Sequence, residues 1–214
     1  MELYVDTANI GQIKEAVSLG ILEGVTTNPS IVAREGRPFK ELIQEIGSIV
    51  PGKVWCEVVA TEAEGMVHEA REISTWVPRA VVKLPMGAEG IKAASRLAQE
   101  GIETNMTLVY SVPQAILAAK AGVNYVSPYL GRVDDTGWSG ADFIRGIVNA
   151  YRMLGFDTKV IAASIRGPRQ VLDVLQLGVD AVTMAYPVLM SMMRHPMTDI
   201  GLQQFLKDWE DAGL

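Results

Sequence analysis

ETNMTLVYSVPQAILAAKAGVNYVSPY, residues 103–129, contains two strand-like runs separated by a helix-like run. The runs at 103–107 and 124–129 are rich in the β-branched and aromatic residues that favour strands. Between them, apolar residues recur at helical spacing, at Val112, Ile116 and Ala119. Gly122 then predicts the end of the helix. This order is typical of two parallel strands joined by a crossover helix.

The same unit recurs along the whole chain. Strand-like runs are expected at residues 2–6, 24–27, 53–59, 80–84, 103–107, 124–129, 158–164 and 180–184. Eight strands alternating with helices close naturally into a barrel, and the alternative is a doubly wound open sheet. The barrel is favoured because eight is its closure number and no Gly-rich dinucleotide fingerprint follows the first strand. The sequence therefore predicts an α/β protein with a single (β/α)8 TIM barrel.

Length and composition restrict the class of protein further. A chain of 214 residues with 49% hydrophobic residues can bury a large core, so we expect residues 1–214 to form one catalytic domain. The formal net charge of −6 argues against nucleic-acid binding, and no run of about 18 apolar residues predicts a membrane span. Cys56 is the sole cysteine, and Met1 leads into the first strand without a signal-like segment. We therefore expect a cytoplasmic protein.

The end of the chain adds one helix to the minimal barrel, at residues 198–211. Its apolar residues fall on one face, at Leu202, Phe205, Leu206 and Trp209. This face is expected to pack on the outer surface of its own barrel, and the alternative is docking on a neighbouring subunit.

Polar side chains interrupt the strands near their carboxyl ends, where such barrels carry their chemistry. The positions are Asp6, Thr26, Asn28, Glu57, Lys83, Asn105, Thr107, Ser127, Tyr129 and Ser164. Alternate strand residues share a face, so pairs such as Asn105 and Thr107 are expected to point into one cavity. An isolated polar residue usually serves as a buried hydrogen-bonding partner, but the whole set favours a functional site.

Lys83 is the sharpest candidate because it lies in an apolar strand, Val81 to Met86, where an unpaired ammonium is costly. An ordinary lysine has a pKa of about 10.4 and carries little free amine at neutral pH. Burial among apolar side chains is expected to lower that pKa and supply the nucleophile. A structural ion pair with Glu57 or Asp6 is the alternative interpretation.

A lysine amine that condenses with a ketose carbonyl forms an imine, which draws electrons from the adjacent carbon–carbon bond and permits its cleavage. This chemistry needs proton carriers. Glu57 is expected to act as general acid and base, directly or through a water shared with Thr107. Asp6 is expected to deprotonate the sugar hydroxyl whose oxygen becomes the aldehyde.

Two other mechanisms have little support because the chain has only two histidines, His68 and His195. A metal-dependent aldolase typically uses histidine ligands, and serine or cysteine hydrolases usually need a histidine base. Neither histidine is expected at the barrel mouth, and a solvated or capping role is expected instead. We therefore expect a metal-independent enzyme.

Three residues near the ends of the sixth and seventh strands form a candidate phosphate site, namely Arg132, Ser164 and Arg166. Arginine suits bidentate recognition of phosphate, and barrels often bind phosphate at their late loops. Each arginine could alternatively be an ordinary surface charge. Their shared position favours the phosphate site.

Motifs along essentially the whole chain resemble those of the small transaldolases and the closely similar fructose-6-phosphate aldolases. They are YVDTAN, GVTTNPS, EVVATEAEGM, VVKLPM, TNMTLV, SPYLGRVDD and AASIRGPRQ. The resemblance implies a cofactor-free barrel in which Lys83 forms the Schiff base and Asp6 handles the hydroxyl proton. Glu57 and Thr107 would then hold the catalytic water.

The resemblance also implies the substrate contacts and the assembly. Thr26, Asn28, Asn105 and Ser127 would line the sugar site, and Arg132, Ser164 and Arg166 would bind the phosphate of a sugar phosphate. The resemblance implies ring-shaped homo-oligomers, commonly decamers of two pentamers, in which the last helix reaches a neighbour. A role in the pentose phosphate pathway follows from the same resemblance.

The sequence favours a transaldolase, which moves a dihydroxyacetone unit from fructose 6-phosphate to an aldose phosphate such as erythrose 4-phosphate. Glu57, Asn105 and Ser127 resemble the transaldolase pattern, whereas Tyr129 resembles the aldolases, which release free dihydroxyacetone and glyceraldehyde 3-phosphate. A phenol hydroxyl can alter protonation of the enamine, so the aldolase activity remains the alternative. A noncatalytic barrel that binds sugar phosphates is the alternative from a different class.

Overall fold

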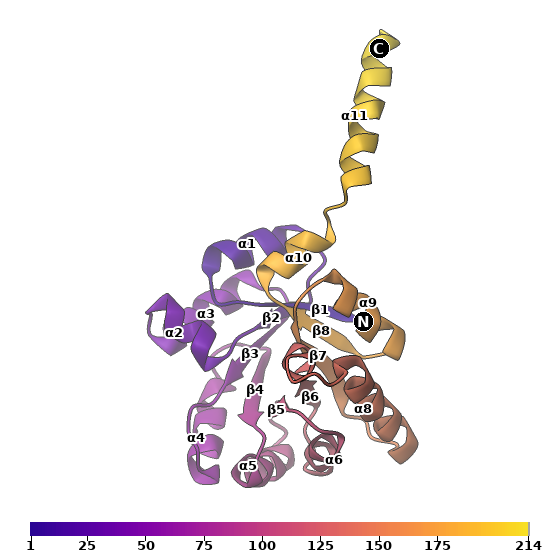
Figure 1. Ribbon diagram of the computed structural model, residues 1–214. Helices are drawn as coiled ribbons and strands as arrows, with labels where there is room; N and C mark the ends of the chain where they lie inside the picture. The colour runs from indigo at the N-terminus through magenta and orange to yellow at the C-terminus, as the bar shows by residue number, and fades with distance from the viewer. Residues whose placement is uncertain (214) are drawn as a thin grey trace.

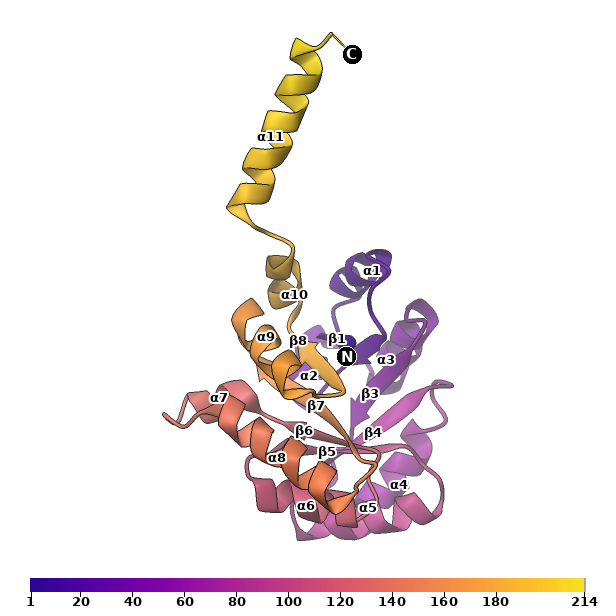
Figure 2. The same ribbon diagram turned by 90° about the vertical axis from the view of Figure 1, so that its right-hand side faces the viewer.

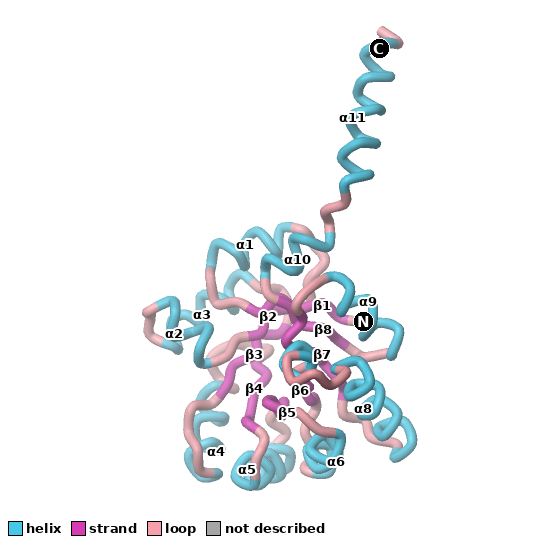
Figure 3. The backbone as a smooth tube through the Cα atoms, viewed as in Figure 1, coloured by secondary structure: helices cyan, strands magenta, loops and turns pink. Residues whose placement is uncertain are grey.

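The computed structural model describes residues 1–213, and in them eight parallel strands close into a barrel (Figures 1 and 3). The strands are β1 (Glu2–Asp6), β2 (Gly24–Thr26), β3 (Lys53–Glu57), β4 (Ala80–Pro85), β5 (Thr104–Val109), β6 (Tyr125–Pro128), β7 (Lys159–Ile165) and β8 (Ala181–Met184). Each strand pairs with its neighbours in sequence, and β1 pairs with β8. This last pairing confirms the predicted TIM barrel and excludes the open sheet.

Helices surround the barrel. They are α1 (Ile10–Ser18), α2 (Pro29–Glu35), α3 (Phe39–Ile49), α4 (Ala63–Ile73), α5 (Ala88–Gln99), α6 (Val112–Lys120), α7 (Leu130–Asp134), α8 (Gly140–Leu154), α9 (Pro168–Leu177), α10 (Tyr186–Met192) and α11 (Pro196–Asp211). Helix α6 begins after Ser111, whose side chain caps the first turn, and ends two residues before Gly122, which has a φ of 85°. The predicted strand–helix–strand unit is therefore confirmed.

The barrel interior is filled near the amino-terminal ends of the strands by a separate apolar cluster. It contains Tyr4, Trp55, Val81, Tyr125, Ile161 and Ala181. The Trp55 ring meets Tyr4 and Tyr125 edge to face, with ring centroids 5.3 and 4.6 Å apart. The larger apolar cluster packs the outer face of the strands against the helices. The barrel interior is thus a packed core, and the polar strand residues lie closer to the carboxyl ends of the strands than this apolar cluster does.

The last helix, α11, stands away from the barrel in both orientations (Figures 1 and 2). None of its described residues is buried. The helix is present as predicted, but the expectation that it packs on its own barrel is wrong. The chain passes His195 in an extended conformation, as a residue before proline prefers, and α11 leaves the surface there. Among residues 1–213, no helix is long and apolar enough to cross a membrane.

Candidate active site

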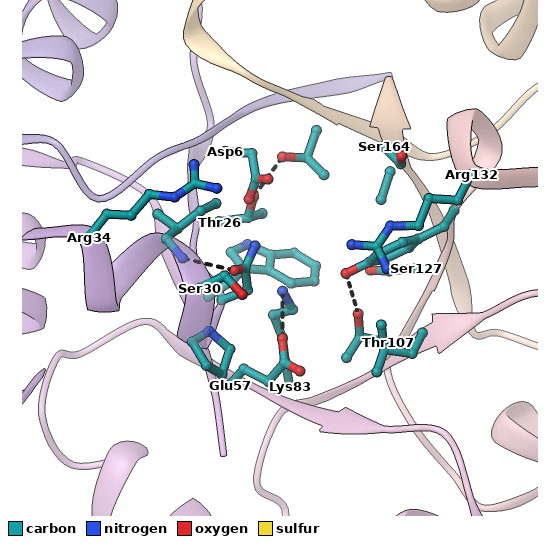
Figure 4. A pocket seen from close by; sticks show the side chains of 18 residues that line it. Asp6, Thr26, Ser30, Arg34, Glu57, Lys83, Thr107, Ser127, Arg132 and Ser164 are labelled. Carbon is teal, nitrogen blue, oxygen red and sulfur yellow. Dashed lines mark hydrogen bonds and ion pairs between the residues drawn. The ribbon is translucent and has the colours of Figure 1, made fainter. Parts of the chain in front are cut away.

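A cavity of about 440 Å³ opens at the carboxyl ends of the strands (Figure 4). Ten of the twelve predicted site residues line it: Asp6, Thr26, Asn28, Glu57, Lys83, Thr107, Ser127, Tyr129, Arg132 and Ser164. They come from the first seven strands, β1 to β7, from the residues that follow β2 and β6, and from helix α7. Strand alternation and barrel closure bring them together, because the inward positions of neighbouring strands meet at one level.

Lys83 lies at the centre of the cavity on β4, and only 5% of its surface is exposed. In the sheet register it faces Glu57 of β3 on one side and Asn105 of β5 on the other. Its Nζ lies 3.2 Å from Glu57 Oε2 and donates a hydrogen bond to the carbonyl oxygen of Thr27 at 2.7 Å. Lys83 is therefore a buried and partnered ammonium, not an isolated one.

The pKa of Lys83 lies above its ordinary value. Burial by itself lowers the pKa, but the charges of Glu57, Tyr129 and Asp6, together with the Glu57 hydrogen bond, raise it by more. The expectation that burial leaves Lys83 with a lowered pKa is therefore wrong. The physical reason is that its polar neighbours come from other strands and stabilise the ammonium. A proton must leave Lys83 before its amine can attack a carbonyl, and Glu57 Oε2 is within reach to accept it.

Asp6, at the end of β1, belongs to a chain of hydroxyl groups. Thr26 Oγ1 donates to Asp6 Oδ1 at 2.7 Å, and Thr183 Oγ1 lies 2.6 Å from Thr26 Oγ1. Because the single Thr26 hydrogen is directed at Asp6, Thr183 is the donor to Thr26. Burial raises the pKa of Asp6, and Lys83 and the Thr26 hydrogen bond only partly oppose this. A raised pKa makes Asp6 a stronger base.

Tyr129 joins the floor of the cavity to its rim. Thr107 Oγ1 lies 3.2 Å from Tyr129 Oη in a hydrogen bond. The guanidinium of Arg132 lies over the Tyr129 ring, 5.2 Å from its centroid, and donates to the Tyr110 hydroxyl at 3.1 Å. Arg132 therefore contacts an aromatic ring and a hydroxyl at the rim, and no acidic side chain among residues 1–213 is paired with it.

Two strands end in left-handed backbone that changes which side chains face the cavity. Leu108 on β5 has a φ of 57° and Ser164 on β7 has a φ of 60°, and the register of each strand shifts at that point. Consecutive residues, Thr107 with Leu108 and Ala163 with Ser164, consequently both line the cavity. Regular alternation would turn one of each pair away, so these bulges deliver Ser164 to the site.

Two predicted residues do not line the cavity. Asn105 is fully buried behind Ser127, whose hydroxyl donates to Asn105 Oδ1 at 3.0 Å, and the Asn105 Nδ2 has no partner within residues 1–213. Arg166 is exposed and forms an ion pair with Asp135. The carboxylate draws this guanidinium away from the cavity, so the predicted cluster of Arg132, Ser164 and Arg166 is only partly assembled.

The cavity also contains residues that the sequence prediction missed. Thr183 carries a signal that could have found it, since it is the polar residue at an inward position of β8. Ser30 and Arg34 lie on α2 and enter the wall from a crossover segment. No strand alternation reveals such residues.

The histidines lie outside the cavity. His68 is exposed on α4, and the side chain of His195 caps α11 by accepting from the backbone N–H of Met197 at 3.2 Å. The predicted solvated and capping roles describe these positions. Among residues 1–213, no group of three or more His, Cys, Asp or Glu side chains is arranged to hold a metal ion.

Comparisons with known proteins agree with this geometry. Residues 3–213 match the family model described as "Transaldolase/Fructose-6-phosphate aldolase". The chain is 50% identical over 212 residues to a "Probable transaldolase" of Heliobacterium modesticaldum, with 99% of each chain covered. It is 52% identical over 211 residues to a "Probable transaldolase" of Caldicellulosiruptor saccharolyticus, covering 98% of this chain and 97% of that protein. A third "Probable transaldolase", of Moorella thermoacetica, is 51% identical with 98% of each chain covered.

Proposed function

The chain belongs to the transaldolase/fructose-6-phosphate aldolase family, and on that premise we propose that it transfers a dihydroxyacetone unit through a Schiff base on Lys83. The donor is fructose 6-phosphate, and the acceptor is an aldose phosphate such as erythrose 4-phosphate. The supporting observation is a buried lysine at the cavity floor with one carboxylate in hydrogen-bonding contact and a second nearby. The reaction needs no metal or cofactor, and the enzyme acts in the cytoplasm within the pentose phosphate pathway.

The first half of the mechanism activates the ketose. Glu57 accepts a proton from Lys83, the free amine adds to the C2 carbonyl, and a proton moves from the nitrogen to the oxygen to give a carbinolamine. Glu57 returns the proton to the carbinol hydroxyl, which leaves as water, so that an iminium forms. The 3.2 Å contact between Lys83 and Glu57 supports this exchange.

The second half breaks and remakes the carbon–carbon bond. Asp6 takes the proton of the C4 hydroxyl, the C3–C4 bond breaks, and its electron pair moves to the iminium to give an enamine and a free aldehyde. The raised pKa of Asp6 suits it to this role. An acceptor aldehyde then enters, and the same steps run in reverse to release the new ketose.

Substrate contacts follow from the lining of the cavity. Arg132 and Ser164 bind the phosphate, and Thr26, Asn28 and Ser127 meet the sugar hydroxyls. Asn105 supports Ser127 from behind. Arg166 joins the phosphate only if it exchanges Asp135 for the ligand.

One observation favours a second candidate activity, the release of free dihydroxyacetone by a fructose-6-phosphate aldolase. Tyr129 places a hydroxyl at the cavity wall, hydrogen-bonded to Thr107. That hydroxyl can order the water that protonates the enamine, after which hydrolysis frees Lys83.

The Schiff base is tested by reduction with borohydride in the presence of fructose 6-phosphate. We expect a mass increase that corresponds to one reduced dihydroxyacetone adduct, located on Lys83 by peptide mapping. Lys83→Ala should lose the adduct, and Lys53→Ala is a matched control because Lys53 lies at the opposite end of the barrel, paired with Glu103. An unmodified mass in the wild-type protein, with binding retained, would instead support a noncatalytic sugar-phosphate barrel.

Transfer and release are separated by measuring both products in one reaction. With erythrose 4-phosphate present, we expect seven-carbon ketose phosphate to exceed free dihydroxyacetone. Tyr129→Phe removes only the hydroxyl and should lower the share of free dihydroxyacetone further. Abundant release with negligible transfer would contradict the transaldolase proposal and support the aldolase.

The exposed face of α11 supports a homo-oligomer. Leu202, Phe205, Leu206 and Trp209 form one stripe, and Phe205 and Trp209 are 73% and 59% exposed. Exposure of such an apolar stripe to water is unfavourable, and burial against another protein surface removes that cost. A second copy of the chain offers that surface, and a decamer of two pentamers is the assembly expected; light scattering that gives the mass of one chain would contradict it.

A further inference from the structure

Two arginines face the cavity from opposite walls. Arg34 enters from α2 and Arg132 from α7, and the Nζ of Lys83 lies between them (Figure 4). A ligand attached to Lys83 therefore has a guanidinium on either side of it.

Neither arginine has its charge neutralised by a neighbour. Within residues 1–213, neither forms an ion pair, whereas Arg37 close by is paired with Glu45 at 2.7 Å and Arg166 with Asp135. The cavity lining contains three cationic side chains, Arg34, Lys83 and Arg132, and two carboxylates, Asp6 and Glu57. Both carboxylates act on the charge of Lys83. The mouth is thus positive in a chain whose net charge is −6.

Each arginine is accompanied by a serine on its own wall. Ser164 lines the cavity on the side of Arg132, and Ser30 lies one helical turn before Arg34 on α2. The start of α2 is held by Asn28, whose Oδ1 accepts from the Ile31 N–H at 3.0 Å. A guanidinium with an adjacent hydroxyl is a combination that suits a phosphate oxyanion.

We infer that Arg34 and Ser30 form a second anion-binding position, so that the cavity accepts a ketose with an anionic group at both ends. This inference rests on the proposed function, in which Lys83 holds C2 and Arg132 holds the phosphate on C6. The C1 end then points away from Arg132 and toward the wall of Arg34. Ketose bisphosphates are the chemical class that fits both positions.

The inference is tested with fructose 1,6-bisphosphate as the probe, measured as an inhibitor of fructose 6-phosphate turnover. Arg34→Ala should raise the inhibition constant of the bisphosphate about tenfold more than it raises the KM of fructose 6-phosphate, because a charge-assisted hydrogen bond to the second phosphate is lost. Arg34→Lys should retain part of the effect. Arg37→Ala is the matched control, since it removes an ion-paired arginine outside the cavity lining. The difference should shrink as salt screens the exposed charge.

Three outcomes are decisive. If Arg34→Ala changes the inhibition constant of the bisphosphate and the KM of fructose 6-phosphate equally, Arg34 does not bind a second anion and the inference is overturned. A bisphosphate that binds no more tightly than the monophosphate would also overturn it. If fructose 6-phosphate gives no borohydride adduct, the proposed function has failed instead, and calorimetric titration of the bisphosphate into wild-type and Arg34→Ala proteins then tests the anion position alone.

Discussion

At the scale of the single residue, the site holds one ionisable group, Asp6, at a cost to stability. Asp6 is kept partly buried, and its pKa is raised mainly by that burial. A carboxyl whose folded pKa exceeds its unfolded value makes the protein less stable as the pH rises through the interval between the two. Proteins commonly accept such costs at catalytic positions.

Asp6→Asn is therefore expected to stabilise the protein while abolishing most of its activity. Asparagine can still accept the Thr26 hydrogen bond, and it never ionises. The free energy of unfolding should show a gain at pH 7, because asparagine removes the cost of holding a buried carboxylate ionised. This gain should fall toward zero as the pH is lowered toward the unfolded pKa of about 3.9, where both proteins carry an uncharged side chain.

Denaturant unfolding across pH 4 to 8 measures this difference, with dihydroxyacetone transfer measured in parallel. Thr183→Val is a useful companion, because it removes the outer donor of the hydroxyl chain but leaves Asp6 ionisable. A wild-type protein that is more stable than Asp6→Asn at pH 7 would contradict the argument.

At the scale of the element, the ends of β5 and β7 depart from regular strand geometry. Leu108 and Ser164 adopt left-handed backbone, which costs an L-residue about 1–2 kcal/mol and costs glycine little. Both bulges border the cavity. The strain thus lies where two consecutive side chains face the same cavity.

Replacing Ser164 separates this strain from the chemistry of its hydroxyl. Ser164→Gly and Ser164→Ala both remove the hydroxyl and should weaken phosphate binding to a similar degree. Only glycine relieves the backbone, so Ser164→Gly should be more stable than Ser164→Ala by about 0.5–1 kcal/mol, the strain relief less the added entropy of the unfolded chain.

Thermal or denaturant unfolding of the two variants, with their KM for fructose 6-phosphate, gives both quantities. Ala162→Gly, in the regular part of β7, is the control and should lose about 1 kcal/mol or more. A Ser164→Gly variant less stable than Ser164→Ala would mean that the left-handed conformation carries no cost.

At the scale of the whole molecule, α11 is a 16-residue helix without a buried residue in the described chain. An amphipathic helix draws its stability from the surface that covers its apolar face. The assembly is therefore expected to depend on that face, whereas the fold of the barrel is expected to be independent of it.

Phe205→Glu combined with Trp209→Glu should lower the mass in solution toward the 23.2 kDa of one chain and leave the barrel's circular dichroism largely intact. Lys207→Glu, on the same helix outside the stripe, should leave the mass unchanged. Multi-angle light scattering over a concentration series measures both. An unaltered mass in the double variant would place the interface elsewhere.

The sequence by itself determined the eight strands, the closure into a barrel and most of the inward polar positions. These follow from local periodicity, since the two-residue repeat of a strand assigns Lys83, Glu57 and Thr107 to one side without knowledge of any partner.

Tertiary structure decided the rest. Lys83 is an ammonium because groups from other strands surround it, and Ser164 faces the cavity because the backbone turns left-handed beside it. Arg166 is drawn outward by Asp135, Arg34 comes opposite Arg132, and α11 leaves the barrel. Each of these depends on distances between residues far apart in the chain, which exist only once the barrel has closed.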